Sequence, residues 1–375
     1  MSEIPVTECT RCIMSTKADK NIIFNEAGLC NHCERYDKLL ASRVSINDDS
    51  IFESVIDKIK KAGRGKEYDC LIGVSGGVDS TYVAYLVKQH GLRPLAVHLD
   101  NGWDSELATS NIKNTLEKLG IDLHTHVIDW KEFKDLQLSF LKASLPDGEV
   151  PSDHAIFALM WREAAKRKIK YIVSGMNFQT ESISVPEWSY GHSDWKYIRA
   201  VHKKFGSSKL RTYPRFTFPY LAYIYLFKGV RTVSLLNYVK YDKQKVLYLI
   251  QDKLGWRNYG GKHHESIYTR FYQGYVLPKK FGIDKRYGHL SDLINSGQLS
   301  KEDALKEIKK PPYSEELQQE DKIYVCKKFG ISVREFDEIM KLPPKLFYDY
   351  PNGFKLLMIV KRIVNYLRLK RLYPK

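Results

Sequence analysis

The chain has no long uninterrupted hydrophobic segment. Its longest uncharged apolar stretch, residues 216–227, is about twelve residues long and contains Pro219. A membrane-spanning helix needs about 20 apolar residues, so this stretch is too short to cross a bilayer. The N-terminal residues MSEIPVTECTRC also lack the apolar centre of a secretion signal. We therefore expect a cytoplasmic protein.

Acidic residues are in the minority. The 375 residues contain 44 Asp and Glu against 60 Lys and Arg, a formal net charge of +16. This balance favours anionic ligands such as nucleotides, nucleic acids or an acidic membrane surface, without choosing among them. Hydrophobic residues make up 43% of the chain and charged residues 28%, which is ordinary for a globular protein with a large core.

Cysteine is scarce and unevenly placed. Four of the six cysteines form two Cys-x2-Cys pairs in the first 33 residues, at Cys9, Cys12, Cys30 and Cys33. Two such turns present four thiolates to one tetrahedral ion, a pattern typical of a structural zinc ribbon. The absence of a secretion signal argues against disulfides. We therefore predict that these four cysteines bind Zn²⁺.

The remainder of the chain suggests an α/β fold. We place a zinc ribbon at residues 1–40, a helical connector at 41–66, a nucleotide-binding core at 67–200 and a mostly helical substrate or partner region at 201–375. Within the core, expected strands alternate with expected helices, which predicts a doubly wound, mainly parallel sheet. The expected strands cover 68–74, 94–100, 122–128 and 171–174, and the expected helices cover 80–90, 104–119 and 153–168.

The stretch LIGVSGGVDST, residues 71–81, joins an apolar strand to a helix. A glycine turn at a helix N-terminus presents free backbone N–H groups to an anion. The pattern is neither a Walker A loop, since no lysine follows, nor a dinucleotide fingerprint, since the third glycine is missing. A carboxylate beside a phosphate needs a cation between them, so Asp79 indicates Mg²⁺. The candidate phosphate-binding residues are Ser75, Gly76, Gly77, Val78, Asp79 and Ser80.

SGGVDS is similar to the PP-loop of ATP pyrophosphatases, which have an adenine nucleotide α-hydrolase-like fold. The resemblance implies that ATP is cleaved between its α and β phosphates. A substrate carbonyl oxygen would be adenylylated, and a nitrogen or sulfur nucleophile would displace AMP. It also implies nucleotide contacts at the ends of later strands. These are the backbone of residues 97–99, with His98, Asp100, Gly175 and Asn177.

A dense set of cations follows in the second half, in GGKHHES (260–266) and LPKKFGIDKR (277–286). Such a set suits a polyanionic substrate or departing pyrophosphate. Lys262 can neutralise the leaving group, and His263, His264 and Glu265 can act as a base or orient an amide. A solvated basic surface is the alternative interpretation.

These segments, together with Cys9-x-Arg-Cys12 and the HLDNGW stretch at 98–103, make the chain similar to WbpG/PseA-like N-acetyl sugar amidotransferases. The resemblance implies conversion of an acetamido group, on a nucleotide-linked N-acetyl sugar, to an acetamidino group. Such enzymes serve surface polysaccharide or flagellin glycan biosynthesis and use ATP, Mg²⁺ and Zn²⁺. Ammonia would come from separate glutaminase and cyclase-like subunits that resemble histidine-biosynthesis proteins. No nucleic-acid partner is expected.

Two other functions stay open. A tRNA thiolation enzyme would explain the basic charge and the ribbon, but only Cys70 and Cys326 remain as sulfur carriers. A zinc-ribbon nucleic-acid-binding protein with a relict nucleotide site is the other alternative, and the intact Asp79 and Ser80 argue against it.

The last 25 residues contain seven Lys or Arg and no acidic residue. Apolar positions between 356 and 367 predict an amphipathic basic helix there. Such a helix either docks on its own domain or contacts a membrane surface peripherally.

Overall fold

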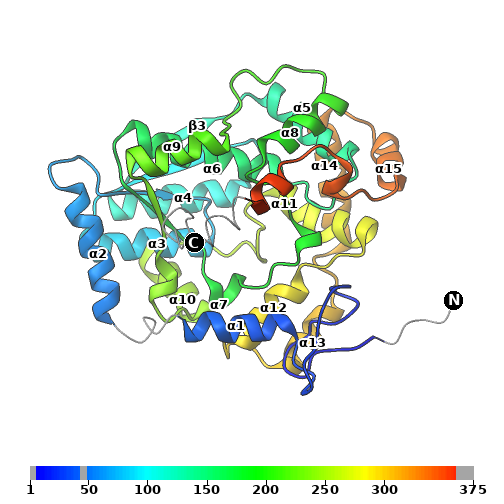
Figure 1. Cartoon of the computed structure of the whole chain (residues 1–375), viewed down its shortest axis with the longest axis horizontal. Coiled ribbons are helices and arrows are strands. Elements are labelled where there is room, and N and C mark those ends of the chain that lie inside the picture. Colours follow the sequence, from blue (N-terminus) through cyan, green and yellow to red (C-terminus); the bar gives the residue numbers. More distant parts are fainter. Residues whose placement is uncertain (1–5, 43–48, 360–375) are drawn as a thin grey trace.

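The computed structural model describes residues 6–42 and 49–359 (Figure 1). At its centre lies a five-stranded, fully parallel sheet with the strand order β3-β2-β1-β4-β5. The predicted doubly wound sheet is confirmed. The strands are β1 (Cys70–Gly73), β2 (Pro94–Asp100), β3 (Asp122–Val127), β4 (Tyr171–Ser174) and β5 (Arg231–Ser234).

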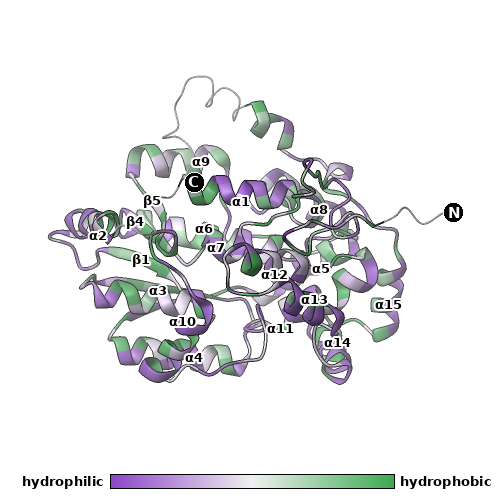
Figure 2. Cartoon of the chain, turned by 90° about the horizontal axis from the view of Figure 1, so that it is seen from below, coloured by the Kyte–Doolittle hydropathy of each residue, from purple (hydrophilic) through white to green (hydrophobic). Residues whose placement is uncertain are grey.

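Helices cover both faces of this sheet. One face packs against α2 (Asp49–Gly63), α3 (Val78–Gln89), α4 (Glu106–Leu119) and α10 (Lys243–Leu254), and α3, α4 and α10 lie together in Figure 2. The other face packs against α6 (Val150–Lys166), with α5 (Trp130–Lys142) and α8 (Trp195–Phe205) outside it. Side chains alternate along β1, so Leu71 points into one cluster and Ile72 into the other.

The strand β5 was not predicted. Its four residues are all half-buried and lie at the sheet edge, so RTVS carries neither a continuous apolar run nor a clear alternation. It lies beyond the predicted core boundary at residue 200 and pairs with β4. The sheet therefore takes its last strand from the segment expected to be mostly helical.

The C-terminal region is mostly helical, as predicted. Its main helices are α11 (Ile267–Phe271), the π-helix η5 (Tyr272–Phe281), α12 (Arg286–Asn295), α13 (Lys301–Lys309), α14 (Glu315–Phe329) and α15 (Val333–Lys341). No helix in the described ranges combines the length and apolarity that a membrane span requires. The predicted basic helix falls mainly on residues 360–375, which lie outside the described residues.

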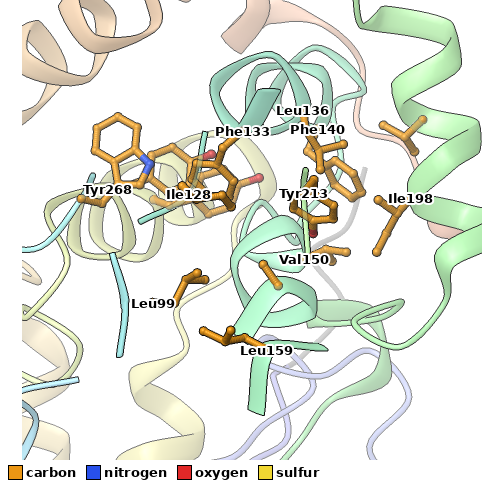
Figure 3. Packing of buried hydrophobic residues seen from close by; sticks show 14 of the residues in the cluster. Leu99, Ile128, Phe133, Leu136, Phe140, Val150, Leu159, Ile198, Tyr213 and Tyr268 are labelled. Atoms are coloured by element: carbon orange, nitrogen blue, oxygen red, sulfur yellow. The ribbon is translucent and has the colours of Figure 1, made fainter. Parts of the chain in front are cut away.

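The C-terminal helices share the core of the α/β domain. Figure 3 shows Leu136 and Phe140 of α5 toward Ile198 of α8, and Phe133 of the same helix beside Ile128; Tyr268 of α11 belongs to the same buried cluster. Because one continuous core joins the sheet to the C-terminal helices, the residues that these helices carry are held rigidly against the strand ends.

Replacement of Phe140 by alanine tests this shared core. The Phe140 ring is fully buried and stands perpendicular to the Tyr197 ring at 5.7 Å between centroids. We expect Phe140→Ala to lower the free energy of unfolding by about 3–5 kcal/mol, through lost transfer energy and a cavity. Equilibrium unfolding in urea measures this change in the free energy of unfolding. Val127→Ala, at a side chain that is 70% exposed, is the control and should change stability by less than about 0.5 kcal/mol.

Candidate active site

The glycine turn forms the N-terminal end of α3, after the carboxyl end of β1. Gly76 has φ +78°, and a Cβ on it would lie 2.5 Å from the carbonyl oxygen of Ala108 in α4. Only glycine fits this close approach. The Trp256 indole donates to the Gly76 carbonyl oxygen at 2.9 Å. The turn is thus clamped from two sides at the N-terminal end of α3, the end of a helix that favours anions.

A cavity of about 460 Å³ opens over this turn, and we call it the phosphate cavity. It lies where the loops after β1 and β4 diverge, at the switch point of strand order at which doubly wound sheets bind ligands. Residues distant in sequence converge here. Its polar lining includes Ser75, Asp79, Ser80, Glu181, Tyr241, Lys243, Tyr259, Lys262, His263, Glu265 and His289.

Three carboxylates line the phosphate cavity, and Asp79 and Glu181 are two of them. Burial and the nearby Glu181 raise the pKa of Asp79, although the Tyr241 hydroxyl donates to its Oδ1. The repulsion between Asp79 and Glu181 would be relieved by a shared cation. Magnesium is normally held by one or two carboxylates together with substrate phosphates. Asp79 and Glu181 are therefore the residues that would hold Mg²⁺, whose charge would offset that of a bound polyphosphate.

Two lysines balance these carboxylates. Lys262 Nζ lies 3.1 Å from Glu181 Oε1 and 3.4 Å from the Thr180 carbonyl oxygen. Burial opposes the ionised form of Glu181, but Lys262 outweighs it and lowers the pKa of this carboxyl. Burial, together with the charge of Lys262, lowers the pKa of Lys243. An anionic ligand would relieve the repulsion between the two ammonium groups, so the cavity suits a polyphosphate.

A second cavity, also of about 460 Å³, adjoins the first, and we call it the acceptor cavity. Ser75, His263 and Glu265 line both. The Glu265 backbone carbonyl accepts a hydrogen bond from the Ser105 N–H at 2.8 Å, which holds the 260–266 loop against the segment after β2. The remaining polar lining comprises His98, Asn101, Asp104, Asp147, Glu149, Ser152, Asp153, His192, Ser266, Thr269, Gln273 and Lys285.

The acceptor cavity contains an ion pair and a proton-carrying carboxyl. His192 Nε2 lies 2.8 Å from Asp147 Oδ2; burial opposes both charges, yet the pair lowers the pKa of Asp147 to about 2 and raises that of His192 to about 9. Burial and the neighbouring Asp153 raise the pKa of Glu149 to about 8. Glu149 Oε2 accepts from the Thr269 hydroxyl at 2.7 Å. In the described chain, Glu149 Oε1 has no partner, so one oxygen is available to exchange a proton with a ligand.

The predicted site residues divide into two groups. The structure brings the turn residues other than Gly76 to the phosphate cavity, together with Gly175, Lys262 and Glu265. His98 lines the acceptor cavity, but both ring nitrogens bind protein: Nδ1 lies 2.8 Å from the Val74 carbonyl oxygen and Nε2 lies 3.1 Å from Asp104 Oδ2. It therefore positions the start of the turn.

Gly76, Asp100, Asn177 and His264 are the predicted catalytic and nucleotide-binding residues that line neither cavity. Asp100 accepts from the Gly102 N–H at 2.9 Å within the loop after β2. The buried Asn177 caps α7 (Phe178–Glu181), and its Oδ1 accepts from the Thr180 N–H at 3.0 Å. The His264 ring packs against Tyr313, because the left-handed backbone of His263 (φ +63°) turns the two imidazoles apart. His263 is the histidine of this pair that reaches the cavities.

Several lining residues were missed by the sequence reasoning. Tyr241, Lys243, Trp256, Tyr259 and His289 come from segments with no recognisable spacing relative to the glycine turn. Trp256 and Tyr259 lie just before GGKHHES, and His289 lies three residues after LPKKFGIDKR. Burial and the neighbouring Lys262 and His263 lower the pKa of His289, which is therefore a neutral imidazole at pH 7.

The four N-terminal cysteines form a compact buried cluster. Their Sγ atoms all lie within 4.8 Å of one another, with 3.9 Å between Cys9 and Cys33 and 3.7 Å between Cys12 and Cys30. Tetrahedral zinc with bonds of about 2.3 Å requires sulfur separations of about 3.8 Å. The geometry therefore fits Zn²⁺, and the predicted zinc ribbon is supported.

The ribbon docks on α12, which also carries His289 of the phosphate cavity. Cys33 Sγ lies 3.2 Å from the amide oxygen of Asn295, whose buried Nδ2 has no partner in the described structure. Turning that amide over lets Nδ2 donate to a zinc-bound thiolate. From the same helix, Asp292 accepts from the Ser182 hydroxyl and the Ile183 N–H, at 2.5 and 3.0 Å. The ribbon thus stabilises the helix that borders the phosphate cavity.

Comparison with known proteins agrees with this architecture. Residues 265–363 match the family model of the LPS biosynthesis protein WbpG-like C-terminal domain. The SGGVDS turn lies between β1 and α3, and the domain match confirms the resemblance to WbpG-like proteins that was named from the sequence. The uncharacterised protein MJ1599 of Methanocaldococcus jannaschii is 24% identical over 324 residues, which cover 84% of this chain and 97% of that protein.

Shorter or more distant similarities also occur. The tRNA-specific 2-thiouridylase MnmA 2 of Fusobacterium nucleatum is 30% identical over 116 residues, 28% of this chain and 32% of that protein. NMN synthetase from Francisella tularensis aligns at a TM-score of 0.37 with 14% identity, over 84% of this chain and 98% of the other. The NH3-dependent NAD synthetase from Campylobacter jejuni aligns at a TM-score of 0.31 with 13% identity, over 80% of this chain and 98% of the other.

Zinc removal should destabilise the ribbon and α12 together. We expect a chelator to lower the melting temperature of the metal-loaded protein, because the small ribbon has little core of its own. Differential scanning calorimetry, with metal content determined before and after chelation, measures this. Cys12→Ser should reproduce the loss, whereas Cys70→Ser, distant from the cluster, should leave the zinc content unchanged. An unchanged or raised melting temperature on chelation would contradict a structural zinc site.

Proposed function

We propose that this protein is an ATP-dependent amidotransferase that converts the acetamido group of a nucleotide-linked N-acetyl sugar into an acetamidino group. The observation that carries the proposal is the junction of the two cavities at Ser75, His263 and Glu265. One cavity suits a magnesium-bound polyphosphate, and the other contains a proton-exchanging carboxyl. A reaction that joins an activated carbonyl to a nitrogen nucleophile needs a nucleotide site and a proton-exchanging group next to each other.

The proposed chemistry has two steps. The acetamido oxygen attacks the α-phosphorus of ATP, an O–P bond forms, and the bond to the β-phosphate oxygen breaks. The departing pyrophosphate stays near the α3 N-terminus, where Lys243 and Lys262 neutralise its charge. Ammonia then adds to the activated carbon, and AMP leaves with the former acetamido oxygen. Burial raises the pKa of Glu149 to about 8, so its ionised form, which predominates above that pH, can accept the proton that the nitrogen releases.

The WbpG-like domain supports a sugar of surface glycans as the acceptor. Lysines and histidines around both cavities suit the diphosphate of a nucleotide sugar. Ammonia from separate glutaminase and cyclase-like subunits, as the family resemblance implies, completes the proposed reaction. Their docking surface is not part of this proposal, and free ammonium can replace them in the test.

The tRNA thiolation function has weaker support. Its support is the partial similarity to MnmA 2, a tRNA-specific 2-thiouridylase. Sulfur transfer needs an accessible, acidic thiol. Cys70 and Cys326 are both buried, and burial raises the pKa of each. Neither lines the phosphate or acceptor cavity.

Mass spectrometry of the reaction products tests the proposal. The protein is incubated with Mg-ATP, ammonium and a panel of UDP- and CMP-linked N-acetyl sugars. We expect one sugar to become about one mass unit lighter, as NH replaces oxygen, with equal amounts of AMP and pyrophosphate. AMP formation stimulated by bulk tRNA, without any change in a sugar, would instead favour thiolation.

The role of Asp79 is tested by Asp79→Asn. This substitution keeps the shape of the side chain but removes the charge that would hold Mg²⁺, so we expect AMP formation to fall at least about 100-fold. Asp252→Asn, at an exposed carboxylate on α10, is the matched control and should retain full activity. Circular dichroism and thermal unfolding establish that both variants fold. Normal turnover by Asp79→Asn would contradict the metal-linked role.

A further inference from the structure

A basic groove lies at the edge of the sheet opposite the active site. Its volume is about 690 Å³, and its lining contains no acidic residue. Lys66 precedes β1 and Lys168 and Lys170 precede β4, whereas the phosphate-binding turn follows the carboxyl end of β1. The lining comprises Lys66, Arg162, Ala164, Ala165, Lys166, Lys168, Ile169, Lys170, Tyr220, Tyr223, Ile224, Phe227, Lys228 and Val230.

The cations of this groove are not neutralised by the protein. Among the described residues, none of the six groove cations forms an ion pair. Lys66 Nζ donates to the Lys168 carbonyl oxygen at 2.9 Å, and Arg162 donates to the Arg215 carbonyl oxygen at 2.5 Å. Partial burial, with the charge of Lys170, lowers the pKa of Lys66. Like charges held together at this edge would be stabilised by an external anion.

Exposed apolar side chains border the same groove. They come from α9 (Phe218–Tyr223) and the following π-helix η3 (Ile224–Lys228), which lie at the periphery beside β5 (Figures 1 and 2). Phe227 is 77% exposed and Leu226 51%, and Tyr220 and Tyr223 are also exposed. This is the longest apolar stretch of the sequence, and it is too short to span a bilayer. Four large apolar side chains on one solvent-facing segment indicate a surface that is covered in function.

We propose that this surface, the α9 groove, binds peripherally to an anionic membrane, with the α9–η3 side chains entering the lipid interface. Tyr and Phe are favoured at the headgroup level of a bilayer, and flanking lysines bind anionic lipids. Protein interfaces are depleted in lysine, so a second copy of the chain fits this composition less well. Single-stranded nucleic acid would stack on the aromatic rings but would not bury Leu226.

This orientation has a consequence for catalysis. A membrane bound at the amino-terminal edge of the sheet leaves the carboxyl-terminal edge, with both cavities, facing water. Soluble substrates and an ammonia-supplying partner can therefore reach the site while the protein is attached. The proposal itself does not depend on the proposed reaction.

Vesicle sedimentation of the full chain tests the membrane proposal. We expect binding to phosphatidylcholine vesicles that contain phosphatidylglycerol and little binding to phosphatidylcholine alone. Raised salt should weaken the binding through screening. The triple variant Lys166→Gln, Lys168→Gln, Lys170→Gln should lose about 100-fold in partition, since each lysine contributes about fivefold at an anionic surface. Leu226→Ala with Phe227→Ala should lose about tenfold or more, through the loss of inserted apolar area.

Matched controls come from α10. Tyr248 is 72% exposed there and Lys253 is also exposed, so Tyr248→Ala with Lys253→Gln removes similar groups from another surface. It should bind vesicles like the wild type, and all variants should bind Mg-ATP equally. Equal vesicle binding by the groove variants and the wild type would overturn the proposal. Binding of single-stranded RNA that depends on the groove, without vesicle binding, would also overturn it. The proposal would fail as well if the protein formed a dimer that Phe227→Ala dissociates.

Discussion

The close approach of the Gly76 backbone to α4 is the constraint on which the site depends. A side chain at this position would meet the Ala108 carbonyl oxygen at 2.5 Å, so the turn after β1 can be this tight only with glycine. The tight turn places the N-terminal end of α3, where helices favour anions, beside the phosphate cavity. Trp256, from a segment 180 residues further along the chain, fixes the turn by donating to the Gly76 carbonyl oxygen. The anion site and the C-terminal region are thus parts of one structure.

The second constraint is electrostatic. Asp79 and Glu181 face one cavity with Lys243 and Lys262, and each group changes the protonation of its neighbours. Burial opposes the charged forms of Asp79, Glu181 and Lys243. A magnesium-bound polyphosphate would satisfy both signs at once. In the acceptor cavity, the ion pair of Asp147 and His192 leaves Glu149 as the group that can exchange a proton near pH 7 to 8.

The zinc ribbon contributes at a distance. Its cluster contacts Asn295, and α12 in turn holds the loop after α7 through Asp292. The cysteine module therefore stabilises one wall of the phosphate cavity without lining it. The basic charge of the chain is likewise divided by location, since some cations face the cavities and others form the α9 groove at the opposite edge.

The sequence by itself determined the elements whose signals are local. Alternating strands and helices predicted the parallel sheet, the Cys-x2-Cys pairs predicted the metal cluster, and SGGVDS predicted the anion-binding turn, because each depends on residues within a few positions of one another. Lys262 and Glu265 were also predicted, since they belong to a dense polar motif. The edge strand β5 was not, because its four half-buried residues carry no pattern.

Tertiary structure alone decided which polar groups meet. Tyr241 reaches Asp79 across 162 residues, and Trp256 reaches Gly76 across 180. The left-handed backbone at His263 selects that imidazole for the cavities and turns His264 toward Tyr313. Asp100 and Asn177 follow strand ends as predicted, yet their side chains bind nearby backbone groups instead of facing either cavity. Spacing along the chain places a residue near a strand end, but backbone dihedrals and packing against distant helices decide where its side chain points.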